Sequence, residues 1–137
     1  MTDRRIVITG IGVISPLGND LASTWEAMKA CRSGIDTIKS MDVTDYSTKI
    51  AGEVKDFDPT PYFKTPKDAR RVDRFTHFAM GAAGMALKDS GMDLEAEDKT
   101  RIGVMVGSGI GGLGTLESQH ATLLSKGPAR VSPFMIP

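Results

Sequence analysis

The sequence lacks a cysteine pair, because Cys31 is the only cysteine among its 137 residues. No internal disulfide can form, and this composition fits the reducing cytosol, where we expect the protein to be located. There is no excess of charge, since 17 Lys and Arg balance 17 Asp and Glu, so nothing global points to nucleic acid as a partner. No apolar run is long enough to cross a bilayer, and residues 6–8 are too few for the core of a signal peptide.

A recognisable set of catalytic or metal-binding residues is also missing. His77 and His120 stand singly within predicted helices, and the chain has no Ser-His-Asp set, HExxH motif or carboxylate pair. Cys31 falls on the apolar face of a predicted helix near its C-terminal end, where a buried structural side chain is more typical than a reactive thiolate. We therefore expect no catalytic residue, no cofactor site and no metal site within these residues.

Short apolar runs alternate with amphipathic segments along the chain. RRIVITG (4–10) and RIGVMVG (101–107) have the composition of buried strands, and 46–57 has the weak alternation of an extended segment. Helices are predicted from a cap at Asn19 or Asp20 to about Cys31, over 68–90, and over 113–126 before Gly127-Pro128. Strands that alternate with helices predict an α/β fold with parallel strands, in one domain.

The predicted helix over 68–90 is unusually thin at one point. Gly81 and Gly84 enclose two alanines, so this stretch of the helix has almost no side-chain bulk. Glycine lowers the stability of a helix, and a compensating gain is needed. We expect another element of the protein to pack closely against this stretch.

The segment GVMVGSGIGGLG (103–114) contains four glycines within six positions and also satisfies the pattern GxGxxG. A predicted strand precedes it and a predicted helix follows, as in dinucleotide-binding loops. However, the acidic residue that should follow about twenty residues later is missing, and the Gly-Lys-Ser/Thr of a phosphate-binding loop is absent too. Nucleotide binding is therefore a remote alternative to a tight strand-to-helix turn with close backbone packing.

A basic cluster occupies the start of the predicted helix over 68–90. Lys67, Arg70, Arg71 and Arg74 are spaced i, i+3, i+4 and i+7, which places them on one helix face. Such a face is either simply solvated or a docking patch for an acidic partner, and the spacing alone permits both. Nucleic acid is a less suitable partner, because no aromatic side chains alternate with these charges.

Seven segments of the chain occur in the order found in one enzyme family. They are RRIVITGIGVISPLGN, W…SGI, AGEVKDFDP, RRVDRFTHFA, ALKDSG, RIGVMVGSGIGGLGTLE and GPARVSPFMIP. Together they cover essentially all of residues 1–137, and the chain resembles the N-terminal part of bacterial β-ketoacyl-[acyl-carrier-protein] synthases. The resemblance is greatest to the elongating enzymes of type II fatty acid synthesis.

The resemblance implies a thiolase-like α/β fold with αβαβα layers, of which this chain would form most of the first of two similar halves. It implies decarboxylative condensation of acyl- and malonyl-loaded acyl carrier protein by a homodimer, with no cofactor and no membrane or nucleic-acid partner. In family members the nucleophilic cysteine and two histidines lie beyond the position of Pro137, and Cys31, His77 and His120 do not match them. The resemblance therefore implies that residues 1–137 are the N-terminal part of the enzyme, truncated before the nucleophile and inactive alone.

The resemblance also assigns binding roles to individual residues. Ile110 matches a position that lines the acyl pocket and controls its depth. Met135 and Ile136 match positions that reach across the dimer interface to the partner's acyl pocket, although the family more often has an aromatic residue at 135. The positions that would dock the acidic carrier protein are Lys67, Arg70, Arg71 and, as a weaker addition, Arg130.

Two alternatives within the same fold remain open. One is a ketosynthase that serves polyketide or special-lipid synthesis. The other is a chain-length factor, which shares the fold but lacks the nucleophile and does not catalyse condensation.

Overall fold

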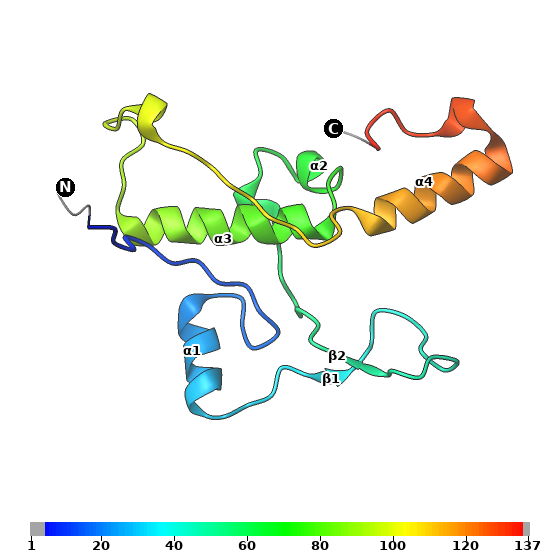
Figure 1. The fold of residues 1–137 in the computed structure, drawn as a ribbon, viewed down its shortest axis with the longest axis horizontal. Coiled ribbons are helices and arrows are strands. Elements are labelled where there is room, and N and C mark those ends of the chain that lie inside the picture. The colour runs from blue at the N-terminus through cyan, green and yellow to red at the C-terminus, as the bar shows by residue number, and fades with distance from the viewer. Residues whose placement is uncertain (1–4, 136–137) are drawn as a thin grey trace. The chain divides into compact units, whose positions relative to one another are not determined.

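The computed structural model describes residues 5–135. These residues form four helices, α1 (Leu21–Lys29), α2 (Pro66–Ala69), α3 (Arg74–Ser90) and α4 (Leu113–Lys126), and a hairpin of β1 (Asp36–Thr37) and β2 (Ile50–Ala51) (Figure 1). Short 3₁₀ turns occur at η1 (Thr60–Tyr62), η2 (Lys99–Arg101) and η3 (Pro128–Arg130). The chain divides into two compact units, one of residues 5–58 with 81–99 and one of residues 59–80 with 100–135.

Helix α1 begins where the sequence predicts. The carboxylate of Asp20 accepts a hydrogen bond from the Ser23 amide at 2.7 Å, which satisfies one of the free N–H groups of the first turn. The helix ends at Lys29, so Cys31 lies beyond it, in the left-handed region with φ of 50° and an exposed thiol. The expectation that Cys31 is buried on a helix face is therefore wrong.

The N-terminal segment packs against the thin stretch of α3, as the sequence predicts. A Cβ atom built on Gly12 would overlap the main-chain carbonyl of Ala82, so only glycine allows this approach. On the same stretch, Gly81 faces the Phe57 ring and Ile14, and a Cβ there would lie only 2.6 Å from the ring. The close contact compensates for glycine inside the helix.

The two predicted parallel strands do not form a sheet. Within residues 5–135 the only ladder is antiparallel, with Asp36 opposite Ala51 and Thr37 opposite Ile50. The apolar runs at 5–9 and 102–107 are unpaired and exposed, with Ile6 93% and Met105 98% accessible. A strand needs a neighbouring backbone to accept and donate its hydrogen bonds, and the described residues supply none to either run.

The β1–β2 hairpin is closed by a carboxylate. Glu53 accepts hydrogen bonds from the main-chain amides of Lys39 at 2.9 Å and Ser40 at 3.1 Å, next to the bond from the Ile38 amide to the Lys49 carbonyl. A hydrogen bond from the Ser40 side chain first, and the bond from the Lys39 amide second, favour the ionised form and lower the pKa of Glu53 below its usual 4.5.

Acidification should therefore release this end of the hairpin. Because the pKa of Glu53 is lower in the folded state, its contribution is fully present above the unfolded-state pKa of 4.5 and is lost as the pH falls through the lower folded value. The amides of Lys39 and Ser40 should lose their hydrogen-exchange protection in that acidic range and keep it at pH 6. Glu53→Gln should remove the pH dependence, and protection that is constant from pH 6 to pH 3 in the native sequence would contradict the assignment.

No helix in the described part of the chain combines the length and the apolar character that crossing a membrane requires.

Candidate functional site

The basic cluster lies on two helices instead of one. Helix α2 ends at Ala69 and α3 begins at Arg74, so the predicted continuous helix over 68–90 is wrong at its start. Thr65 caps α2: its hydroxyl accepts from the Asp68 amide at 3.2 Å and donates to the Asp68 carboxylate at 2.8 Å. The four basic residues are thus brought together by a helix, a turn and a second helix, and they do not share one helical face.

Two of the four cations lie over aromatic rings. The guanidinium of Arg71 is 5.2 Å from the centre of the Phe134 ring, and that of Arg74 is 5.0 Å from the centre of the Phe78 ring. A cation over a ring face is attracted by the π electrons, so both guanidinium groups have a preferred position.

The other two cations, Lys67 on α2 and Arg70 at its C-cap, are exposed and belong to the same short segment. Within residues 5–135 neither forms an ion pair, and the nearby Asp68 carboxylate is engaged by Thr65. Their positive charge is therefore available to an acidic partner.

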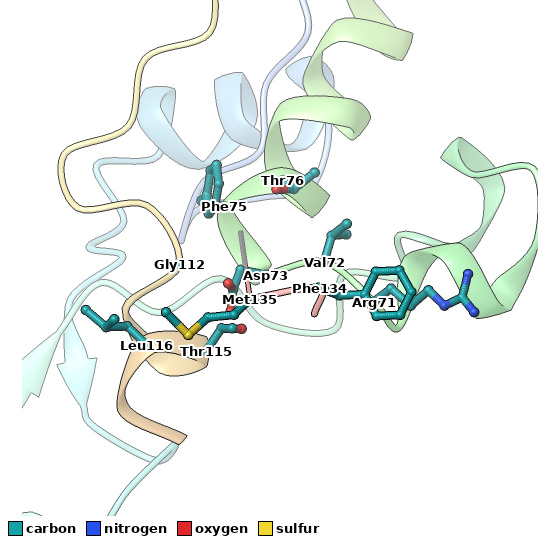
Figure 2. A pocket seen from close by; sticks show the side chains of 10 residues that line it. All are labelled: Arg71, Val72, Asp73, Phe75, Thr76, Gly112, Thr115, Leu116, Phe134 and Met135. Carbon is teal, nitrogen blue, oxygen red and sulfur yellow. The ribbon is translucent and has the colours of Figure 1, made fainter. Parts of the chain in front are cut away.

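A pocket of about 270 Å³ lies beside this cluster within the second unit (Figure 2). Its walls come from the turn and first residues of α3, the first turn of α4 and the chain after η3, through Arg71, Val72, Asp73, Phe75, Thr76, Gly112, Thr115, Leu116, Phe134 and Met135. The structure thus brings Met135, predicted to reach an acyl pocket, into one site with Arg71, predicted to dock a protein.

The glycine loop before α4 has one glycine whose backbone angle favours glycine and one that a side chain approaches closely. Gly111 has φ of 75°, and its amide donates to the Ser108 hydroxyl at 3.0 Å. A Cβ built on Gly112 would overlap the Asp73 carboxylate, which lies at the start of α4, where a negative charge is favourable. Gly107 and Gly109 have open space around them. The loop therefore turns into α4, but within the described residues no strand precedes it and its one close approach is to a side chain, so the prediction of close backbone packing is wrong.

Asp73 is a site residue that the sequence analysis did not single out. Its carboxylate lines the pocket and faces α4, from the turn that separates α2 and α3. The only local signal is a glycine at the N-cap position of α4, and that signal does not identify its partner.

The remaining predicted residues lie elsewhere. Ile110 is 76% exposed in the glycine loop and does not line the pocket. Arg130 ends η3 and shares a shallow depression with Thr122 and Lys126 of α4. Ile136 lies outside the described residues. In the described part of the chain, no three His, Cys, Asp or Glu side chains are grouped so that they could hold a metal ion.

The comparisons with known proteins decide the family. Residues 3–137 match the N-terminal domain of β-ketoacyl synthases. The chain belongs to the β-ketoacyl synthase family. It is similar to 3-oxoacyl-[acyl-carrier-protein] synthase 2 of Vibrio harveyi, with 47% identity over 137 residues, which is 100% of this chain and 33% of the relative. The protein of that name from Staphylococcus aureus (strain COL) is 47% identical over 135 residues, which is 98% of this chain and 32% of the relative.

Solved ketosynthases share the fold. The ishigamide ketosynthase/chain length factor has a TM-score of 0.73 and 28% identity, over 94% of this chain and 32% of that one. A type II polyketide ketosynthase, solved in complex with its acyl-carrier protein and bound to a hexaketide, also has a TM-score of 0.73 and 28% identity. The match covers 93% of this chain and 33% of that one. The β-ketoacyl synthase chain described here therefore has the thiolase-like α/β fold of ketosynthases, and it spans about a third of the length of these relatives.

Proposed function

We propose that this chain is the N-terminal part of a synthase that elongates fatty acids. The observation that carries this proposal is the 47% identity, over the whole chain, to a 3-oxoacyl-[acyl-carrier-protein] synthase 2. The proposed enzyme acts as a homodimer in the cytoplasm on acyl- and malonyl-loaded acyl carrier protein, and it needs no cofactor.

The proposed reaction is a decarboxylative condensation. The acyl group moves from the carrier-protein thioester to a cysteine of the enzyme, and the first carrier protein leaves as a free thiol. The malonyl thioester loses CO₂, and the resulting carbanion attacks the acyl carbon, forms the new C–C bond and expels the cysteine thiolate. In this proposal the cysteine and two histidines come from the chain beyond residue 137, and this part binds the substrates.

Docking of the carrier protein is the first binding role. An acidic partner would meet Lys67, Arg70 and Arg71, with Arg130 as an additional contact. Support comes from the exposure of all four side chains and from the absence of ion pairs at Lys67 and Arg70 within residues 5–135. Exposed complementary charge increases the rate of encounter and fixes the orientation of the partner.

Acyl binding is the second role. We assign Ile110 to the lining of the acyl pocket, and Met135 and Ile136 to the pocket of the partner subunit. Support for Ile110 comes from a branched apolar side chain that is 76% exposed, between glycines with open space around them. Such a side chain can move without displacing a packed neighbour, which suits a gate.

Enlarging the gate should shorten the acyl chains that the synthase accepts. Ile110→Phe should lower kcat/KM for long acyl chains about tenfold, because overpacking a fitted pocket opposes binding, and should leave short chains nearly unaffected. Ile110→Leu, which conserves volume, is the matched control. The measurement is the elongation rate as a function of acyl chain length in the synthase that contains this chain. Equal rates for both variants with long acyl chains would show that Ile110 does not line the acyl pocket.

A polyketide ketosynthase or chain-length factor is the second candidate. The solved structures with TM-scores of 0.73 carry those names, which favours this class. Their identity of 28% is lower than the 47% shared with the fatty acid enzymes, so elongation of fatty acids remains the primary proposal.

The test uses the protein expressed from the complete reading frame that contains this chain. Supplied with acyl- and malonyl-loaded carrier protein, it should release one CO₂ and form one 3-oxoacyl product per condensation. Repeated condensation without reduction would support the polyketide alternative. A glutamine in place of the nucleophilic cysteine, with no condensation, would support the chain-length factor.

A further inference from the structure

His77 connects the two helices that carry the basic cluster. It lies in the first turns of α3, and its Nε2 atom is 2.6 Å from the main-chain carbonyl oxygen of Ala69, the last residue of α2. Its ring also meets the Phe63 ring edge-on, at a centroid distance of 5.8 Å and an interplanar angle of 87°. The histidine is half-buried, and Ala69 is buried.

The chemistry of this contact fixes the position of the proton. A carbonyl oxygen can only accept a hydrogen bond, so Nε2 of His77 must carry hydrogen and donate. The Ala69 carbonyl is one of the groups that a helix leaves unsatisfied at its C-terminal end. His77 therefore supplies from α3 the donor that α2 cannot supply for itself.

Helix α2 depends on such anchors because it has only four residues, Pro66–Ala69. A single turn is far below the length at which a helix is stable alone in water. Thr65 holds the N-terminal end through Asp68, and the His77 bond holds the C-terminal end. Lys67 lies between these anchors and Arg70 directly follows them.

We propose that His77 is a positioning residue for carrier-protein docking: its Nε2–H anchors the end of α2 and so holds Lys67 and Arg70 in the arrangement that an acidic partner binds. This inference rests on the proposed docking function. It assigns to His77 no contact with substrate and no step of the condensation.

Loss of the Nε2–H donor of His77 should lower the fraction of molecules in which Lys67 and Arg70 have the arrangement that the acidic partner binds. The docking cations themselves stay in place. The apparent Kd then rises by the inverse of the competent fraction, while the bound complex is unchanged. The turnover rate at saturating carrier protein and the slope of log Kd against log salt, which reflects the number of charges engaged, should both stay the same. Removal of a docking cation would instead reduce that slope.

The experiment compares two uncharged variants of the complete synthase. His77→Phe keeps a ring against Phe63 and loses the donor, whereas His77→Gln keeps an N–H donor three bonds from Cβ and loses the ring. His77→Phe should raise the Kd for acyl carrier protein, and its KM, about fivefold with kcat and salt slope unchanged. His77→Gln should stay within about twofold of the native protein, and His120→Phe, at an exposed histidine of α4, should have no effect.

Several outcomes would overturn the proposal. Native affinity in His77→Phe would show that the bond positions nothing, and equal weakening in both variants would assign the effect to ring packing. If His77→Phe does not fold, His77→Asn provides the second test, because its shorter amide does not reach Ala69 and it should reproduce the fivefold rise. If Arg70→Glu loses affinity for acyl carrier protein while the His77 variants keep it, the role of His77 is rejected and the docking function is retained. If Arg70→Glu binds acyl carrier protein with native affinity, both are rejected.

Discussion

Reversing the charges of Arg70 and Arg71 together should weaken binding of acyl carrier protein about 100-fold at low salt, because each new carboxylate repels the acidic partner. Arg70 is exposed and, within residues 5–135, unpaired, so its replacement breaks no ion pair of the folded chain. Replacing Arg71 removes its contact with the Phe134 ring, and within the described residues it breaks no ion pair. The effect should therefore appear in Kd with little change in the stability of the synthase.

The matched control reverses Arg32 and Lys88, which are also exposed and lie in the other compact unit. This pair changes the net charge by the same amount, so it separates local docking from long-range attraction. The difference between the two double variants should be large at 50 mM salt and nearly vanish at about 1 M, where the screening length falls to roughly 3 Å. Equal affinity of the two double variants at low salt would reject the docking cluster.

Helix ends that carry a local signal could be predicted from the sequence. Helix α4 spans Leu113–Lys126 as expected, because Gly127, with φ of 80°, ends it and the apolar spacing defines its length. Helix α1 begins at the predicted Asp20 cap for the same local reason. Such signals act over a few residues, which is the range that a single sequence describes well.

Features that depend on distant partners could not be predicted. The break between α2 and α3 coincides with a hydrogen bond from His77 to Ala69, eight residues apart, and helical spacing contains no sign of it. The runs at 5–9 and 102–107 have strand composition, but a strand also requires a neighbouring backbone. Composition thus identified the segments and could not identify what they pair with.

The candidate site shows the same division. The exposed cations could be identified in the sequence, but the sharing of one pocket by Arg71 and Met135 depends on how the start of α3 meets the chain after η3. Asp73 could not be identified, because the glycine at the N-cap position of α4 does not reveal which distant residue approaches it. The roles of Ile110 and Met135 rest on resemblance to the family and remain predictions.

Substitution of Gly12 should have the largest effect on stability. A Cβ at this position would overlap the Ala82 carbonyl, which belongs to the main chain of α3 and cannot rotate away as a side chain can. Either the N-terminal segment or the helix must move, and the contact of Ile14 with Gly81 would be lost with it. Gly12→Ala should lower the free energy of unfolding by about 3 kcal/mol, the cost of overpacking a close backbone contact.

The matched control is Gly109→Ala, because a Cβ there meets nothing within 4 Å and Gly109 has no positive φ. That variant should be neutral or more stable by about 0.5 kcal/mol, since alanine restricts the unfolded chain more than glycine does. Gly12 and Gly109 lie in different compact units, so urea unfolding of the synthase that contains this chain is followed by far-UV circular dichroism, which reports on both units. Equal midpoints for the two variants would show that the segment at Gly12 does not press on α3, and the thin stretch at Gly81 would then need another explanation.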